Sequence, residues 1–183
     1  MKRHPLVIAA VLGALVASLS QTGWTQFKSA EYRYTAFAPP GWQPLIPNSH
    51  SFPVINFPQS ERVEGAVLPE SGAIIEVGPG GGTAKTVRDL YLKELPEGTV
   101  PTMDQTLLVP APDPDACRTL REVGWDVNLG DADHPVFEHS TSFYCELHNR
   151  VFVVRVEYYH GNKDAKTLDA LALTVARTLR ISK

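Results

Sequence analysis

The stretch Asn149–Ser182, "NRVFVVRVEYYHGNKDAKTLDALALTVARTLRIS", decides the predicted fold because it contains a strand followed by a helix. In its first part the side chains alternate between two faces, and one face carries Phe152, Val154, Val156 and Tyr158. In its second part apolar residues recur at helical spacing, as the stripe Leu168, Leu171, Ala172, Val175 and Leu179. Asn162 or Asp164 is the expected N-cap. We therefore predict a long strand and an amphipathic C-terminal helix.

The residues upstream predict the other arm of a hairpin, with His148 and Asn149 at its tip. One face of this arm carries Phe137, His139, Thr141, Phe143, Cys145 and Leu147. Shorter strands are expected within residues 31–42, 65–68, 72–78, 106–110 and 117–129. Another helix is expected from the spacing of Val87, Leu90, Tyr91 and Leu95. Because strands occur in runs rather than alternating with helices, we predict one antiparallel α+β domain over residues 21–183.

Residues 1–20 have the pattern of a cleaved signal peptide. Two basic residues open the segment, residues 6–19 form an apolar run without charge, and the expected cut lies near Ser20. The alternative is a membrane anchor, but a span needs roughly 18 apolar residues or more, and this run is shorter. No cysteine near the cut is available for a lipid anchor. We predict an exported protein, periplasmic or extracellular, without a stable membrane anchor after cleavage.

Composition argues against nucleic acid or anionic lipid as a partner. The formal charge is −3, and it becomes −5 when Lys2 and Arg3 leave with the signal peptide. No run of basic residues stands against this acidic balance. The 43% hydrophobic content is typical of a globular chain rather than a disordered one.

Cys117 and Cys145 are the only two cysteines, and both lie in the exported part of the chain. An even count in an oxidising compartment predicts one disulfide. A metal site or a catalytic thiol is the alternative. Both are disfavoured because the two residues lie far apart, without a CxxC motif and without a patterned histidine.

The glycine-rich segment 76–90, "EVGPGGGTAKTVRDL", has the outline of a phosphate-binding loop. A Walker loop needs G-x-x-x-x-G-K-[ST], since its backbone N–H groups must wrap the phosphates. With Lys85 and Thr86 at the end of the motif, Pro79 and Ala84 occupy the two required glycine positions. We therefore predict a strand-to-helix connection and no nucleotide.

A cluster of metal-ligand residue types occurs at Asp131, Asp133, His134, Glu138 and His139. Histidines that share a strand face are an even number of residues apart, whereas His134 and His139 are five apart. A zinc site remains possible only if Pro135 ends the strand between them, and a solvated turn is the favoured interpretation. The sequence contains neither G-x-S-x-G nor S-x-x-K, and Arg155 and Glu157 suit a same-face ion pair. We predict no catalytic residue, no metal ligand and no cofactor.

A family resemblance is carried by the two ends of the exported chain. "YRYTAFAPPGWQPL" resembles the opening Tyr-x-Phe-x-x-Pro-x-Gly-Trp segment of the PsbP-like superfamily, with matches at Tyr34, Phe37, Pro40, Gly41 and Trp42. The ending of the chain, a long strand, a helix and a closing Leu-Arg-Ile phrase, is similar to the ending of that superfamily. The resemblance covers most of residues 27–182.

The resemblance implies an α/β/α sandwich, with a central antiparallel sheet and helices on both of its faces. The superfamily includes an extrinsic protein of photosystem II, a Ran-binding nuclear transport cofactor and secreted bacterial proteins of unknown role. These proteins mostly bind other proteins rather than catalyse. No photosystem or Ran-binding residue can be carried over, because only structural positions match, and fold analogy alone assigns no function.

The sequence context predicts that some large apolar residues pack in the core and that others form a contact surface. Trp42 and Trp125 are expected to pack in the core, because Trp42 ends a strand and Trp125 alternates with valines. The proline-rich segment 43–60 is expected to be extended and irregular, and at best an edge strand. It is also the predicted contact surface, with Phe52, Ile55 and Phe57 exposed or half-exposed. Its alternative role is a loop laid over a sheet edge.

Two functions from different classes remain. The favoured one is a non-catalytic binding or accessory protein of the cell envelope, which contacts a protein or a small apolar ligand. The alternative is an extracytoplasmic hydrolase or metal-dependent enzyme without a recognisable motif. A site in which His139 meets carboxylates would favour the enzyme, and an exposed apolar surface would favour the binding protein.

Overall fold

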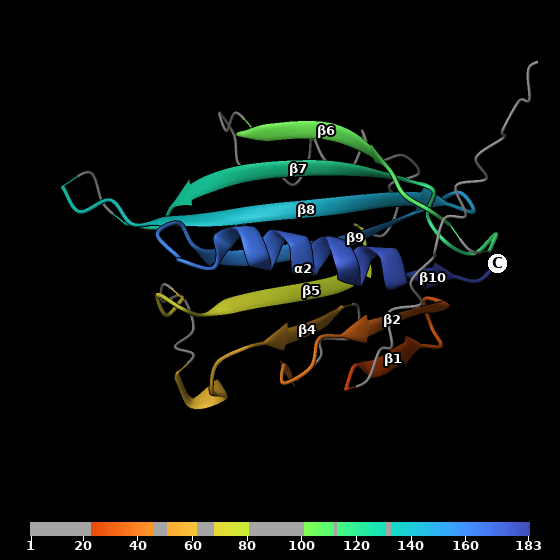
Figure 1. Cartoon of the computed structure of the whole chain (residues 1–183), viewed down its shortest axis with the longest axis horizontal. Helices are drawn as coiled ribbons and strands as arrows, with labels where there is room; N and C mark the ends of the chain where they lie inside the picture. The colour runs from red at the N-terminus through yellow and green to blue at the C-terminus, as the bar shows by residue number, and fades with distance from the viewer. Residues whose placement is uncertain (1–22, 46–50, 62–67, 81–100, 112, 131–132) are drawn as a thin grey trace, which may run out of the picture.

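The computed structural model describes residues 23–45, 51–61, 68–80, 101–111, 113–130 and 133–183. Two antiparallel sheets contain most of the regular secondary structure of the described chain, and Figure 1 shows one helix lying across the larger sheet. The signal peptide predicted at residues 1–20, the glycine-rich loop and the helix predicted from Val87 to Leu95 lie outside the described residues. Within those residues, no helix is both long enough and apolar enough to cross a bilayer.

The larger sheet has seven strands in the order β3-β4-β5-β9-β8-β7-β6, and the smaller has three in the order β1-β2-β10. The strands of the large sheet are β3 (Gln43–Pro44), β4 (Phe52–Ile55), β5 (Ala73–Pro79), β6 (Met103–Leu108), β7 (Thr119–Asn128), β8 (Phe137–Leu147) and β9 (Arg150–Tyr159). The remaining elements are β1 (Thr25–Ser29), β2 (Tyr34–Ala38), the 3₁₀ turn η1 (Gln59–Glu61), α2 (Ala165–Thr178) and β10 (Arg180–Ile181).

The hairpin predicted from the sequence is formed by β8 and β9, which lie in the interior of the large sheet. His148 and Asn149 have φ values of 52° and 58°, the left-handed conformation that a two-residue type I′ turn needs at both positions. This turn sets the register, and the strands pair from Leu147 with Arg150 to Glu138 with Tyr159. β9 also pairs with β5 along its other edge, so it is an interior strand.

The main core lies between the large sheet and α2. The four residues predicted to share a face of β9 are at most 3% exposed: Phe152, Val154, Val156 and Tyr158. Of the predicted stripe of the helix, four residues are buried (Leu168, Ala172, Val175 and Leu179) and Leu171 is half-buried. The periodicities of β9 and α2 are therefore confirmed.

The small sheet packs against this core beside α2 (Figure 1). The ring of Phe27 stacks on Phe52 with centroids 4.0 Å apart, and the Tyr34 hydroxyl donates to the carbonyl of Val77 over 3.2 Å. The Phe37 amide donates to the hydroxyl of Thr178 in α2. These contacts fill the part of the sheet face that α2 leaves uncovered.

The predicted α/β/α sandwich with helices on both faces is wrong. The described residues are mostly β-structure, and their single α-helix, α2, lies on one face of the large sheet. The layer that holds α2 is completed by three strands rather than by another helix, because Phe27 and Tyr34 bury their rings on the sheet. The opposite face carries a separate apolar cluster of Val123, Trp125, Tyr144, Val151 and Val153.

The proline-rich segment is more regular than expected. The sequence predicted an irregular stretch or at best an edge strand, and β3 is indeed the two-residue edge of the large sheet. However, β4 is an inner strand that pairs with β3 on one side and β5 on the other. Trp125 is buried and Trp42 is half-buried against the main core, so the packing predicted for both is confirmed.

The two cysteines form the predicted disulfide. Cys117 lies just before β7 and Cys145 lies in β8, and their Cα atoms are 5.9 Å apart, within the usual range for a disulfide. Both residues are buried in the main core. The bond closes a loop with a sequence separation of 28 residues.

Removal of this disulfide is expected to lower stability. In the chain-entropy model, closing a loop of this size stabilises the folded state by about 3–4 kcal/mol. The Cys117→Ala/Cys145→Ala variant should lose about that much free energy of unfolding in urea titrations monitored by tryptophan fluorescence. Wild-type protein unfolded in the presence of reductant is the matched control and should give a similar value. Equal stability of the variant and the oxidised wild type would contradict a structural role.

Candidate functional site

The predicted contact residues of the proline-rich segment do not form an exposed surface. Ile55 is fully buried and Phe57 is 7% exposed, and both belong to a small apolar cluster with Leu45, Leu68 and Ile74. Phe52 is half-buried under the stacked ring of Phe27. The expected exposure is therefore wrong for Ile55 and Phe57. A contact role for this segment stays a prediction, and of the three residues named for it, Phe52 alone is partly exposed.

The predicted acidic and histidine cluster is divided by the sheet. Glu138 and His139 are neighbours on β8, so their side chains point to opposite faces. Asp133 and His134 lie before the strand begins, and Asp131 lies outside the described residues. In the described part of the chain, no group of three His, Cys, Asp or Glu side chains is arranged to hold a metal ion.

His139 instead joins a polar cluster on the face that carries α2. Its Nδ1 lies 2.6 Å from the carboxylate of Asp126 on β7, and its Nε2 lies 3.0 Å from the hydroxyl of Thr141. The other carboxylate oxygen of Asp126 lies 3.6 Å from Nε2 of His160. Both nitrogens of His139 are thus engaged by protein groups. The His139 ring therefore links the side chains of β7 and β8 on this face of the sheet.

Tyr158 connects the same cluster to the helix. Its ring lies 5.1 Å from that of His139, and its hydroxyl donates to both carboxylate oxygens of Asp169 in α2 over 3.0 and 3.1 Å. Burial, followed by the negative charge of Asp169, raises the pKa of Tyr158. The tyrosine therefore stays protonated and holds the first turns of α2 against β9.

Sequence reasoning missed Asp126 and His160 as partners of His139. Asp126 lies on a neighbouring strand and faces His139 only because of the register between β7 and β8. His160 immediately follows β9. The available signal was the alternation of β7, which places Asp126 an even number of residues from Gly124 and Glu122 on one face.

Glu138 lies on the other face of the sheet, close to a second carboxylate. Burial, followed by the negative charge of Glu157, raises the pKa of Glu138 from the ordinary 4.5 to about 7. Ser140, directly opposite Glu157, is 4% exposed, and none of the described residues forms a hydrogen bond with its hydroxyl. Arg155 lies 3.9 Å from Glu157, which confirms the ion pair expected from the sequence.

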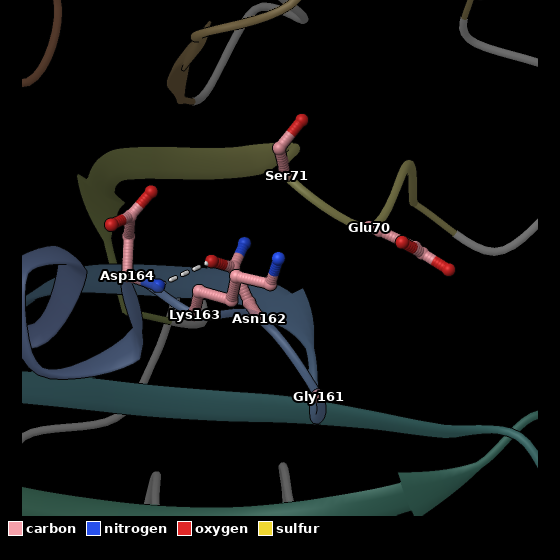
Figure 2. A pocket seen from close by; sticks show the side chains of 6 residues that line it. All are labelled: Glu70, Ser71, Gly161, Asn162, Lys163 and Asp164. Atoms are coloured by element: carbon pink, nitrogen blue, oxygen red, sulfur yellow. Dashed lines mark hydrogen bonds between the residues drawn. The ribbon is translucent and has the colours of Figure 1, made fainter.

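A small polar pocket lies where the loop after β9 passes the turn before β5 (Figure 2). Its volume is about 210 Å³, and it is lined by Glu70, Ser71, Gly161, Asn162, Lys163 and Asp164. Asn162 is buried, and its side-chain oxygen accepts the Asp164 N–H over 2.8 Å. Asp164 is the N-cap of α2, as expected, but its own side chain makes no capping bond. The lining is too polar and too small for the usual apolar ligand pocket.

The outer edge of β6 is open among the described residues. β6 ends the seven-stranded sheet, and within the described residues only β7 pairs with it. Four of its six residues are exposed, and Leu108 is 85% exposed, the highest value among the large hydrophobic residues of the described chain. Pro110 follows the strand closely, so the open edge is short.

The direction of the backbone groups on β6 follows from its ladder. The amide of Val109 donates to Arg118 over 2.9 Å, and hydrogen-bonded positions alternate along an antiparallel strand. Val109, Leu107 and Gln105 therefore bond toward β7. The N–H and C=O groups of Asp104, Thr106 and Leu108 point away from the sheet. Three consecutive outward pairs are thus available to another strand.

Two solved structures share this fold. The Ran-binding protein Mog1p of Saccharomyces cerevisiae matches with a TM-score of 0.51 and 13% identity, over 86% of this chain and 95% of Mog1p. The cyanobacterial PsbP (CyanoP) of Synechocystis sp. PCC 6803 matches with a TM-score of 0.53 and 11% identity, over 90% of this chain and 96% of CyanoP. No protein-family model and no curated protein matches the sequence.

The chain therefore has a PsbP/Mog1-like fold, and the resemblance read from its two ends is confirmed at that level. Identities of 11% and 13% establish the fold alone. The arrangement of polar groups described above belongs to this chain and has to be interpreted on its own chemistry.

The raised pKa of Glu138 predicts a pH-dependent stability. The unfolded chain releases this proton near pH 4.5 and the folded chain near pH 7, so folding favours the protonated form and stability falls as pH rises through this window. Because the side chain is only partly buried, solvent screening reduces the expected loss to about 1–2 kcal/mol at pH 8.

The Glu138→Gln variant should escape this loss. We expect it to match the wild type near pH 4.5 and to exceed it at pH 8, in urea titrations at both pH values. Glu146→Gln, on the same strand, is the matched control and should follow the wild type. If the free energy of unfolding depends on pH in the same way for Glu138→Gln and wild type, Glu138 has the same pKa in the folded and unfolded states, and the prediction is wrong.

Proposed function

We propose that this chain is an exported accessory protein of the cell envelope that acts by binding another protein. The observation that carries the proposal is the outer edge of β6, with which no described strand pairs, together with its outward backbone groups and the 85% exposed Leu108. Exposed edges attract other strands, and proteins commonly shorten them, charge them or cover them. An edge left open is therefore a feature expected of a protein-binding surface.

The comparison with Mog1p supports a protein rather than a small molecule as the partner. Mog1p is a Ran-binding protein, so the same fold serves protein recognition in at least one other chain. A small apolar ligand is less well supported, because the pocket in Figure 2 is lined mainly by charged and amide groups. The identity of the partner is not carried over from Mog1p.

A hydrolytic function receives less support from the geometry. His139 does meet Asp126, which is the arrangement that would favour an enzyme. The nitrogen that would act on a substrate, however, is engaged by Thr141, and the side chain of His139 is only 17% exposed. The cluster is better explained as the polar link between β7, β8 and the start of α2.

Affinity capture tests the proposed function. The full chain, expressed with its own leader and purified from the envelope fraction, should retain a defined protein partner through a high-salt wash. The same sample should be analysed for metal. Failure to retain any specific protein, together with stoichiometric zinc or another metal, would contradict the proposal and support the enzyme alternative.

Export makes a separate prediction. If residues 1–20 are a signal peptide, the mature protein should begin at or near Gln21 and contain the Cys117–Cys145 disulfide. N-terminal sequencing and non-reducing mass spectrometry of the envelope fraction measure both features. A full-length chain with reduced cysteines in the cytosol would contradict export.

A further inference from the structure

We propose that the partner contributes an extended segment that pairs antiparallel with β6, as an eighth strand of the large sheet. This inference rests on the proposed function and specifies which part of a partner would be bound. The argument depends on the backbone of β6 and on three side chains that flank its outer edge.

The edges of the two sheets differ in how well they are protected. β3, at the opposite end of the large sheet, has two residues, and one of them is Pro44, which has no N–H to donate. β1, an edge of the small sheet, carries Lys28, and a lysine on an edge opposes strand addition. β6 has six residues and no proline, and its one charged residue, Asp104, is paired with Arg121 over 2.5 Å. Of these three edges, β6 is the one that a strand can join most readily.

Hydrogen bonding determines that the occupant is extended. The outward N–H and C=O groups of Asp104, Thr106 and Leu108 recur at every second residue, a spacing that only another strand reproduces. A helix satisfies its backbone groups internally and could not pair with them. The partner segment therefore needs about six residues, which is roughly 20 Å of extended chain.

The three outward residues also indicate the side chains of the partner. Asp104, Thr106 and Leu108 alternate with the residues that bond to β7, so their side chains share the face of the sheet that carries Trp125. In an antiparallel pairing, a suitable segment has an apolar residue opposite Leu108 and a β-branched residue opposite Thr106. Opposite Asp104, which already bonds to Arg121, it has a polar or basic residue.

A second copy of this chain fits the edge less well. Full two-fold overlap of β6 with itself would centre on Thr106 and would place Asp104 of each copy opposite Leu108 of the other. A carboxylate would then face an apolar side chain at both ends of the ladder, which is an unfavourable cross-strand pair. A different protein can place a polar residue opposite Asp104 and an apolar residue opposite Leu108, and the cross-strand side-chain pairs therefore favour a different protein.

A short peptide provides the direct test. The probe is the heptapeptide Thr-Ile-Thr-Val-Thr-Lys-Thr with blocked ends, in which the isoleucine, valine and lysine lie opposite Leu108, Thr106 and Asp104. The peptide is titrated into the mature protein, residues 21–183, and amide NMR signals are followed. The signals of Leu108, Thr106 and Asp104 should shift first. Absence of binding up to millimolar peptide would overturn the proposal.

Two matched pairs of controls separate strand pairing from simple apolar contact. Thr106→Pro removes an outward N–H without breaking the ladder to β7, whereas Thr106→Val keeps it. We expect at least about tenfold weaker peptide binding for the proline variant and little change for the valine variant. Likewise, N-methylation of the isoleucine, valine and lysine nitrogens should abolish binding, and N-methylation of the inner threonine nitrogens, which point away, should not.

The outcomes for the edge and for the proposed function can be told apart. If captured protein dissociates from Thr106→Pro but not from Thr106→Val, the edge is the binding site. Equal capture by both variants, with no peptide binding, overturns strand addition but leaves protein binding in place. A concentration-dependent dimer that Thr106→Pro disrupts would overturn the proposal in favour of a second copy. Urea titrations should confirm that both variants are folded.

Discussion

The double pairing of β9 is the constraint on which the rest of the structure depends. This strand is bonded to β8 along one edge and to β5 along the other, so its register is determined from both sides. That register places Phe152, Val154 and Val156 on one face, where α2 and the small sheet cover them. Each such side chain contributes about 1.5–3 kcal/mol when fully buried. A shift of one residue would turn all three toward the opposite face, and the main core would be lost.

The end of the chain is fastened to the same framework. Ile181 donates its amide to Asp115 over 2.8 Å, Ser182 donates to Arg33 over 2.9 Å, and Arg180 pairs with Asp113 over 3.1 Å. β10 therefore joins the turn before β7 to the small sheet, close to the disulfide of Cys117. The histidine and tyrosine side chains that could otherwise take part in chemistry form contacts within the protein instead. His139 orients against Asp126 and Thr141, and Tyr158 holds α2 through Asp169.

This distribution of polar groups connects the fold with the proposed function. A catalytic site would need a reactive side chain that is free to meet a substrate, whereas the described histidine cluster is largely saturated by its own neighbours. Backbone N–H and C=O groups that point away from the sheet lie instead on β6, where the described sheet ends. In the described part of the chain, one end of this sheet is a two-residue strand with a proline and the other is the six-residue β6, which presents the longer of the two edges. Recognition through the main chain would also account for the absence of any binding motif in the sequence.

The sequence by itself determined the local elements whose periodicity was strong. Alternation predicted β9, helical spacing predicted α2, the His148-Asn149 pair marked the turn, and the two cysteines predicted their disulfide. Only the tertiary structure decided which layer lies on which face, that Ile55 and Phe57 are buried, and that Asp126 faces His139. The physical reason is that periodicity is a property of neighbouring residues, whereas burial and side-chain contact depend on the register between strands that are distant in sequence. The open edge of β6 is of the second kind, because a strand becomes an edge only through the order in which the whole sheet assembles.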